Sequence, residues 1–158
     1  MILLKDLLLE ISSLNLLIPR RVEGRMEKYI QTKAKEYIKN KNVGDFDISG
    51  LGLTTLPALL KNLKIGGSFD CGYNRLDSLV GAPTSVGRDF LCNDNKLTSL
   101  VGAPTSVGGD FYCSYNKLKS LVGAPTSVGE SFLCRDNAVK FTEEQVRAVC
   151  DVKGNINV

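Results

Sequence analysis

The chain has 158 residues, a length typical of one domain that can bury a hydrophobic core. An apolar fraction of 43% and a charged fraction of 23% exclude the composition of a disordered chain. The sequence contains no histidine, which excludes histidine-based acid–base catalysis. No run of 18 apolar residues occurs, so we expect no membrane span.

The net charge of +3 is unevenly distributed along the chain. Residues 1–42 carry nine Lys and Arg against five Asp and Glu, whereas residues 66–141 carry seven of each. Any attraction to nucleic acid or to an acidic surface is therefore expected from the N-terminal segment.

Cysteine usage and the chain start predict a reducing compartment, the cytoplasm. The five cysteines are an odd number and four of them share one repeat position, unlike a secreted disulfide framework. Residues 1–10 are apolar but lack a basic start, and Asp6 and Glu10 interrupt them, which argues against a signal peptide.

Residues 1–42 predict two amphipathic helices. Apolar residues follow helical spacing from Leu3 to Ile18, and Pro19 ends this first helix. A second, basic helix is expected from about Val22 to Lys39. We interpret the pair as a helical hairpin that caps the first edge of the repeats, because an open stack exposes apolar edges and unpaired strand groups.

Two other functions of these helices stay open. The basic stripe would suit nucleic acid, but no aromatic stacking pattern accompanies the charge, so we favour this function less. Its candidate contacts are Arg20, Arg21, Arg25 and Lys28. The N-terminal helices, in particular the one over residues 3–18, would alternatively bind a partner or support self-association.

Ten residues, Ser78-Leu-Val-Gly-Ala-Pro-Thr-Ser-Val-Gly87, recur without change at 99–108 and 120–129, a period of 21 residues. Between the copies lies Phe-x-Cys-x-x-Asn-x-Leu, in which we number Phe as position 4, Cys as position 6 and Asn as position 9. Self-similarity at such a period predicts a solenoid.

The pattern Gly-x-x-Phe-x-Cys-x-x-Asn-x-Leu over residues 43–141 resembles the leucine-rich repeat family, with Phe and Cys where Leu is usual. The resemblance implies an α+β solenoid, a right-handed coil with one parallel β-sheet of about five short strands. Turns are expected near residues 43, 66, 87, 108 and 129, the first degenerate and 23 residues long. It also implies a non-catalytic recognition module, and similar repeats in bacterial and bacteriophage proteins suggest an inhibitor or effector of host proteins.

Strand alternation places each Phe and Cys inside the coil and position 5 outside. We interpret the cysteines as core residues, because no close pair such as Cys-x-x-Cys indicates a metal site. The Asn side chains are expected to form a hydrogen-bonded ladder between turns, and the copied segment an extended or turn-like convex side.

Residues 142–158 are expected to form a C-terminal helical cap and a tail. Thr142 and Gln145 read as a capping box, and Val146, Val149 and Cys150 form the apolar face of this helix. Ile156 and Val158 suggest a short extended segment in the tail.

The informative positions vary while the frame is copied. Aromatic and apolar residues flanked by charges at positions 5, 7 and 8 are typical of a protein interface. We therefore expect another protein, of unknown identity, to bind the exposed sheet face; the alternative is that an end helix covers part of it. The candidate partner-binding residues are Asp70, Tyr73, Leu91, Asp94, Tyr112, Tyr115, Leu133 and Arg135. No catalytic residue, cofactor or metal is predicted.

Overall fold

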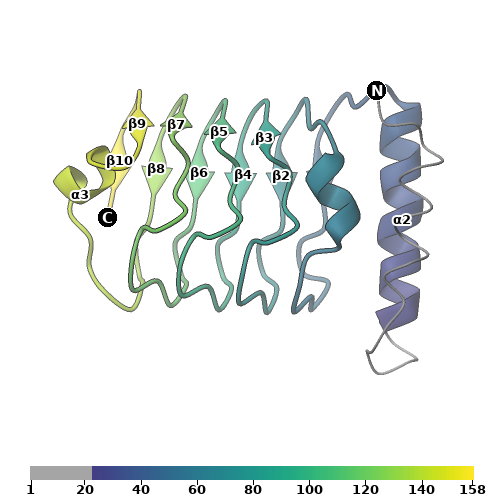
Figure 1. The fold of residues 1–158 in the computed structure, drawn as a ribbon, viewed down its shortest axis with the longest axis horizontal. Coiled ribbons are helices and arrows are strands. Elements are labelled where there is room, and N and C mark those ends of the chain that lie inside the picture. Colours follow the sequence, from purple (N-terminus) through teal and green to yellow (C-terminus); the bar gives the residue numbers. More distant parts are fainter. Residues whose placement is uncertain (1–22) are drawn as a thin grey trace.

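The computed structural model describes residues 23–158, which form a solenoid of stacked turns with a helix at each end (Figure 1). The expected helix over residues 3–18, Arg20 and Arg21 lie outside the described residues. Of the expected N-terminal hairpin the structure therefore describes the second helix, α2 (Glu23–Lys39).

Two parallel sheets run along the solenoid. The larger sheet has six strands in the order β1 (Phe46–Asp47), β2 (Phe69–Asp70), β4 (Phe90–Leu91), β6 (Phe111–Tyr112), β8 (Phe132–Leu133) and β10 (Ile156–Asn157). The smaller sheet has the order β3 (Ser85–Val86), β5 (Ser106–Val107), β7 (Ser127–Val128) and β9 (Asp151–Val152). The predicted solenoid of about 21-residue turns with parallel strands is confirmed, including the degenerate first turn, in which Phe46 pairs with Phe69.

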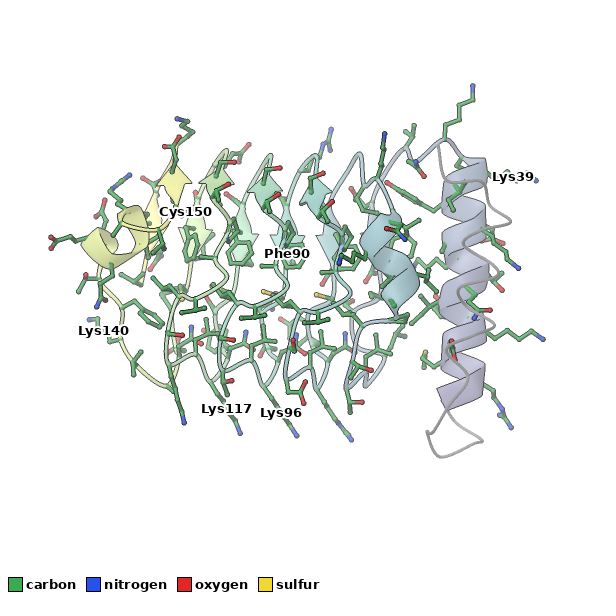
Figure 2. All side chains as sticks on the ribbon, in the orientation of Figure 1. Lys39, Phe90, Lys96, Lys117, Lys140 and Cys150 are labelled. Atoms are coloured by element: carbon green, nitrogen blue, oxygen red, sulfur yellow. The ribbon has the colours of Figure 1, made fainter. Side chains whose placement is uncertain are left out.

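The core is a set of columns, because equivalent residues of successive turns pair in register. Five phenylalanines stack from Phe46 to Phe132, with ring centroids 5.9, 5.6, 5.6 and 5.1 Å apart. The four repeat cysteines lie beside this column and are almost fully buried, as expected of core residues. Figure 2 shows Phe90 inside the coil.

The position-9 asparagines form the expected ladder. The Asn95 amide nitrogen donates to the Cys71 and Cys92 carbonyls at 3.0 and 3.2 Å, and the Asn95 carbonyl oxygen accepts the Leu76 amide at 2.9 Å. Asn74, Asn116 and Asn137 repeat the pattern. Each side chain thereby satisfies backbone groups of two turns at the bend that follows the strand.

The copied segments supply three of the four strands of the smaller sheet, so this side of the coil is extended as expected but also pairs strand to strand. Its glycines permit close backbone approach: a Cβ on Gly108 would lie 2.1 Å from the Gly87 carbonyl oxygen, and one on Gly129 2.1 Å from that of Gly108. Gly102 has a φ of +92°, which side chains rarely tolerate. These contacts explain why the segment keeps its glycines in every copy.

Helix α2 covers the first turn through Ile30, Ala34 and Tyr37, which are buried. The Tyr37 ring packs edge-on against Phe46 at 5.3 Å and ends the phenylalanine column. The Tyr37 hydroxyl accepts the Gly66 amide at 3.1 Å and lies 3.0 Å from the Asn42 and Gly44 carbonyl oxygens. In this turn a 3₁₀ helix, η1 (Ala58–Asn62), replaces the copied segment.

At the other end, α3 (Glu143–Arg147) begins at the predicted capping box of Thr142 and Gln145. Val146 and Cys150 are buried, but Val149 is 46% exposed, so its assignment to the apolar face was wrong. The short helix ends before Val149, which therefore points away from the core. Asp151 and Val152, expected at the end of the helical cap, instead form β9 of the smaller sheet. The extended segment expected in the tail is β10, which adds a sixth strand to the larger sheet.

Candidate protein-binding surface

The outer face of the six-stranded sheet carries a row of position-5 side chains, here called the central row. In register across the sheet these are Asp47, Asp70, Leu91, Tyr112, Leu133 and Asn157. Leu91, Tyr112 and Leu133 occupy three neighbouring strands, about 4.8 Å apart, and are half-buried. Because they are neighbours in register, they form a continuous apolar strip in this row.

A second row, at position 3, is fixed by hydrogen bonds between turns. The Asp45 carboxylate accepts the Ser68 amide at 2.8 Å, Asp89 accepts the Asp110 amide at 2.9 Å, and Asp110 accepts the Ser131 amide at 2.7 Å. Each carboxylate is therefore held at one side of the central row.

On the other side of the central row, the chain bends at position 8 in the left-handed conformation. Tyr73, Asp94, Tyr115 and Asp136 have φ angles of 53°, 54°, 56° and 54°. Aspartate tolerates this conformation, whereas a bulky tyrosine is uncommon there. Tyr73 and Tyr115 are nevertheless 66% and 52% exposed, so burial does not offset the backbone cost. Strain of this kind is concentrated at functional sites.

The two aspartates at the start of the central row influence each other. Partial burial raises the pKa of Asp70, and the charge of Asp47 adds to this, while the Gly72 amide opposes it at 2.8 Å. Burial also acts to raise the pKa of Asp47, but hydrogen bonds from Ser49 and the charge of Lys33 outweigh it and lower this pKa. Negative charge is therefore crowded at Asp70 and partly compensated at Asp47.

The structure brings together the eight residues predicted as a partner-binding site. Asp70, Leu91, Tyr112 and Leu133 share the central row, whereas Tyr73, Asp94, Tyr115 and Arg135 lie at the bends that follow the strands. The Arg135 side chain is exposed, and its amide donates to the Ser114 hydroxyl at 3.0 Å. Arg25 and Lys28, the described nucleic-acid candidates, are exposed on α2 at the end of the solenoid.

Sequence reasoning missed two surfaces. Val80, Val101 and Val122, here called the valine row, are 62%, 45% and 64% exposed on successive copied segments. Exposed cations at positions 10 and 12 form a basic edge, where Lys96 and Lys117 point away from the coil (Figure 2). The basic edge comprises Arg75, Lys96, Lys117, Lys119 and Lys140, and Asp77 is the one anion at positions 10 and 12 of these turns. Sorting charges by repeat position, rather than counting them along the chain, reveals this edge.

The thiols are poor nucleophiles in these surroundings. Burial raises the pKa of Cys71 and Cys92 well above the ordinary range, and their sulfurs donate to the Leu91 and Tyr112 carbonyls at 3.3 and 3.2 Å. Burial and the Asp151 charge raise the pKa of Cys150 to about 11, beside an open depression of about 440 Å³ lined by residues 147–152. Within residues 23–158 no group of three Cys, Asp or Glu side chains is placed to hold a metal ion.

The fold and this surface define a class of protein: a parallel β-solenoid with a helix at each end and an open sheet face. Comparisons with protein-family models, with curated proteins and with solved structures found no match. Among residues 23–158 there is no helix with the length and apolar character of a membrane span.

Proposed function

We propose that this protein is a non-catalytic binding module that holds a partner protein on the outer face of its six-stranded sheet. The main support is the apolar strip of Leu91, Tyr112 and Leu133 on three paired strands. These side chains lie on the outer face, where packing of the core does not require apolar residues. Repeat solenoids present extended surfaces of this kind to partners.

The strained tyrosines support the same face. Tyr73 and Tyr115 lie at bends where Asp94 and Asp136 satisfy the backbone better, and their rings are largely exposed. Large amphipathic rings contribute strongly to protein interfaces. A binding role accounts for residues that reduce stability in the free protein.

We further infer that the repeats are of the leucine-rich type, supported by the repeat signature and by the ladder of Asn74, Asn95, Asn116 and Asn137. That resemblance supports an inhibitor or effector directed at host proteins. Free, buried cysteines are in keeping with a cytoplasmic site of action.

The test is affinity capture from the native cell with wild type and with a Leu91→Glu, Tyr112→Ala variant. Both side chains point away from the core, so the variant is expected to keep its fold, checked by circular dichroism. Loss of the captured protein supports the proposal. Equal capture by the folded variant would show that the sheet face is not the site.

A nucleic-acid function through α2 is the rival, favoured by the exposure of Arg25 and Lys28. It predicts RNA or DNA binding that falls steeply with salt and disappears in an Arg25→Glu, Lys28→Glu variant. Self-assembly through residues 3–18 predicts oligomers at high concentration, and a strict monomer in light scattering would exclude it.

A further inference from the structure

The charges on the outer sheet face are almost all negative. The charged side chains at positions 3 and 5 of the described turns are all aspartates: Asp45, Asp47, Asp70, Asp89 and Asp110. The bends add Asp94 and Asp136, and Arg135 is the one cation at positions 3, 5, 7 and 8 of these turns. The protein as a whole has a net charge of +3, so this face differs sharply from the molecule that carries it.

These aspartates lack ion-pair partners within residues 23–158. The ion pairs in that range are Arg147–Glu143 at 2.8 Å and Lys153–Asp151 at 2.6 Å, both beyond the repeats. At the first turn the charge of Lys33 lowers the pKa of Asp47, but the two side chains make no ion pair. The hydrogen bonds of Asp89 and Asp110 come from neutral backbone amides and, at Asp89, also from the Ser68 hydroxyl at 3.4 Å, which fix the carboxylates without cancelling their charge.

The repeat cations lie elsewhere, mainly on the basic edge at positions 10 and 12, of which Lys96 and Lys117 are labelled in Figure 2. A molecule with one acidic face and one basic edge orients an approaching charged partner before contact. The sheet face therefore repels polyanions and attracts cations.

The apolar strip of the central row lies between two acidic margins. Position 3 supplies Asp89 and Asp110 on one side, and position 8 supplies Asp94 and Asp136 on the other. An occupant that matches this order has apolar side chains in the middle and Lys or Arg on both sides.

The spacing of the strip favours a helical occupant. The strands are about 4.8 Å apart, so apolar side chains recur at that interval along the solenoid axis. Side chains three or four residues apart on a helix recur at about 5–6 Å, whereas alternate residues of an extended chain recur at about 6.8 Å.

We propose that the sheet face binds a cationic amphipathic helix of the partner protein, laid along the solenoid axis with its apolar side chains on Leu91, Tyr112 and Leu133. The inference rests on the proposed function and names the partner's chemistry: a protein segment rich in Lys and Arg, with Leu or aromatic residues at helical spacing.

The test uses two synthetic 18-residue helical peptides with identical leucines and with either Lys or Glu at every charged position. Fluorescence anisotropy measures their binding to the full chain between 50 and 300 mM salt. We expect the Lys peptide to bind with an affinity that falls with salt, and the Glu peptide not to bind.

Three variants assign the site. Asp89→Asn with Asp110→Asn keeps a side-chain oxygen to accept the Asp110 and Ser131 amides and removes both charges, and we expect about fivefold weaker binding of the Lys peptide. Leu91→Ser with Tyr112→Ser keeps every charge, and we expect weaker binding there too, because the peptide leucines lose their contacts. Lys96→Gln with Lys117→Gln on the basic edge is the matched control and should bind the Lys peptide at least as tightly as wild type.

Each contrary outcome has a distinct meaning. Equal binding of both peptides, or no response to the Asp→Asn changes, overturns the cationic partner; if the Leu91→Glu, Tyr112→Ala variant still loses native capture, the proposed function stands. If wild type sediments as a dimer and the Asp89→Asn, Asp110→Asn variant as a monomer, the occupant of the face is a second copy of this chain, which would overturn the inference. Unchanged capture from the native cell by the Leu91→Glu, Tyr112→Ala variant would overturn both proposals.

Discussion

The side of the coil formed by the copied segments and the varied face of the six-stranded sheet are built from the same turns but obey different constraints. On the copied side, backbones approach so closely that a Cβ on Gly108 would lie 2.1 Å from a neighbouring carbonyl oxygen. On the sheet face, position 5 changes from Asp70 to Leu91 and Tyr112 without altering the register. Near-perfect repetition therefore marks the residues that maintain the fold, whereas the positions that differ between turns are the candidates for function.

The two regions also differ in how well each residue suits its backbone. Glycine at Gly102 relieves a positive φ on the copied side, but tyrosine occupies a left-handed bend at Tyr73 and Tyr115 on the other. An exposed tyrosine in a left-handed bend costs backbone energy and gains little from burial, so it contributes little to the stability of the fold. Substitutions in the two regions are therefore expected to change the free energy of unfolding with different sign and size.

The largest effect is expected on the copied side, from Gly108→Ala. The added Cβ would meet the Gly87 backbone at 2.1 Å, and backbone cannot move aside as a flexible side chain can. We expect a loss of about 4 kcal/mol in the free energy of unfolding, measured by urea denaturation. Gly24→Ala on α2 is the control, because its Cβ would meet nothing within 4 Å and alanine favours the helix. Equal stability of the two variants would contradict the close-packing explanation.

Next in size is Asn116→Ala in the ladder that joins the two sides. The change removes the donor to the Cys92 and Cys113 carbonyls and the acceptor of the Leu97 amide, all within the core. Buried polar groups without partners cost about 1–3 kcal/mol each, so we expect a loss of about 3 kcal/mol in urea denaturation. A loss below about 1 kcal/mol would show that water or neighbouring groups replace the ladder.

On the sheet face the sign should reverse. Tyr115→Asn replaces a strained residue with one that tolerates a φ of 56°, and we expect a gain of about 1 kcal/mol in the free energy of unfolding. Asp94→Asn, at a bend with a φ of 54°, should leave stability almost unchanged. We also expect Tyr115→Asn to reduce native capture, so a variant that is more stable and binds equally well would contradict a functional role for this tyrosine.

The smallest effect concerns Asp70, whose raised pKa means that the folded chain binds its proton more tightly than the unfolded chain. The ionised carboxylate therefore costs stability above the folded pKa, and this cost disappears below the unfolded pKa of about 3.9. Asp70→Asn should raise the free energy of unfolding at pH 7 by less than about 0.5 kcal/mol, observed as a slightly higher melting temperature, and make no difference near pH 3.

Asp47→Asn is the matched control for this pH dependence, because the pKa of Asp47 is lowered in the folded chain. Its ionised form stabilises the fold above the unfolded pKa, and this contribution is lost as the pH falls through the folded pKa. The substitution should therefore lower the melting temperature at pH 7. The same sign for both variants would contradict the local charge arrangement.

Much of the fold could be predicted because the repeat period fixes the register. Phe69 and Phe90 lie 21 residues apart and pair, and Asn95 makes the expected bonds. The second sheet was missed because Ser85 and Val86 offer only two strand residues beside Gly and Pro, and their pairing depends on tertiary stacking. Val149 was misassigned because the helix ends at Arg147, too short for a regular apolar face.

The candidate site could be predicted only in part. Alternation along the strand placed Leu91 and Tyr112 on the outer face, and both side chains are partly exposed there. The left-handed φ of Tyr73 and Tyr115 could not be read from tyrosine, although Asp94 and Asp136 at the same position are the signal that could have indicated it. The predominantly negative charge of the face was hidden because residues 66–141 carry equal numbers of acidic and basic side chains, and these totals conceal their segregation by repeat position.

Under the proposed function, the outer face of the six-stranded sheet binds the partner protein, whereas the copied side only maintains the fold. Affinity capture from the native cell with paired variants tests this division most directly. Three proteins are compared: wild type, Leu91→Glu with Tyr112→Ala on the face, and Val101→Glu with Val122→Glu on the valine row, where both side chains are already exposed. We predict that the face variant loses the captured partner while the valine-row variant retains it at the wild-type level. Retention by the face variant together with loss by the valine-row variant would contradict the account.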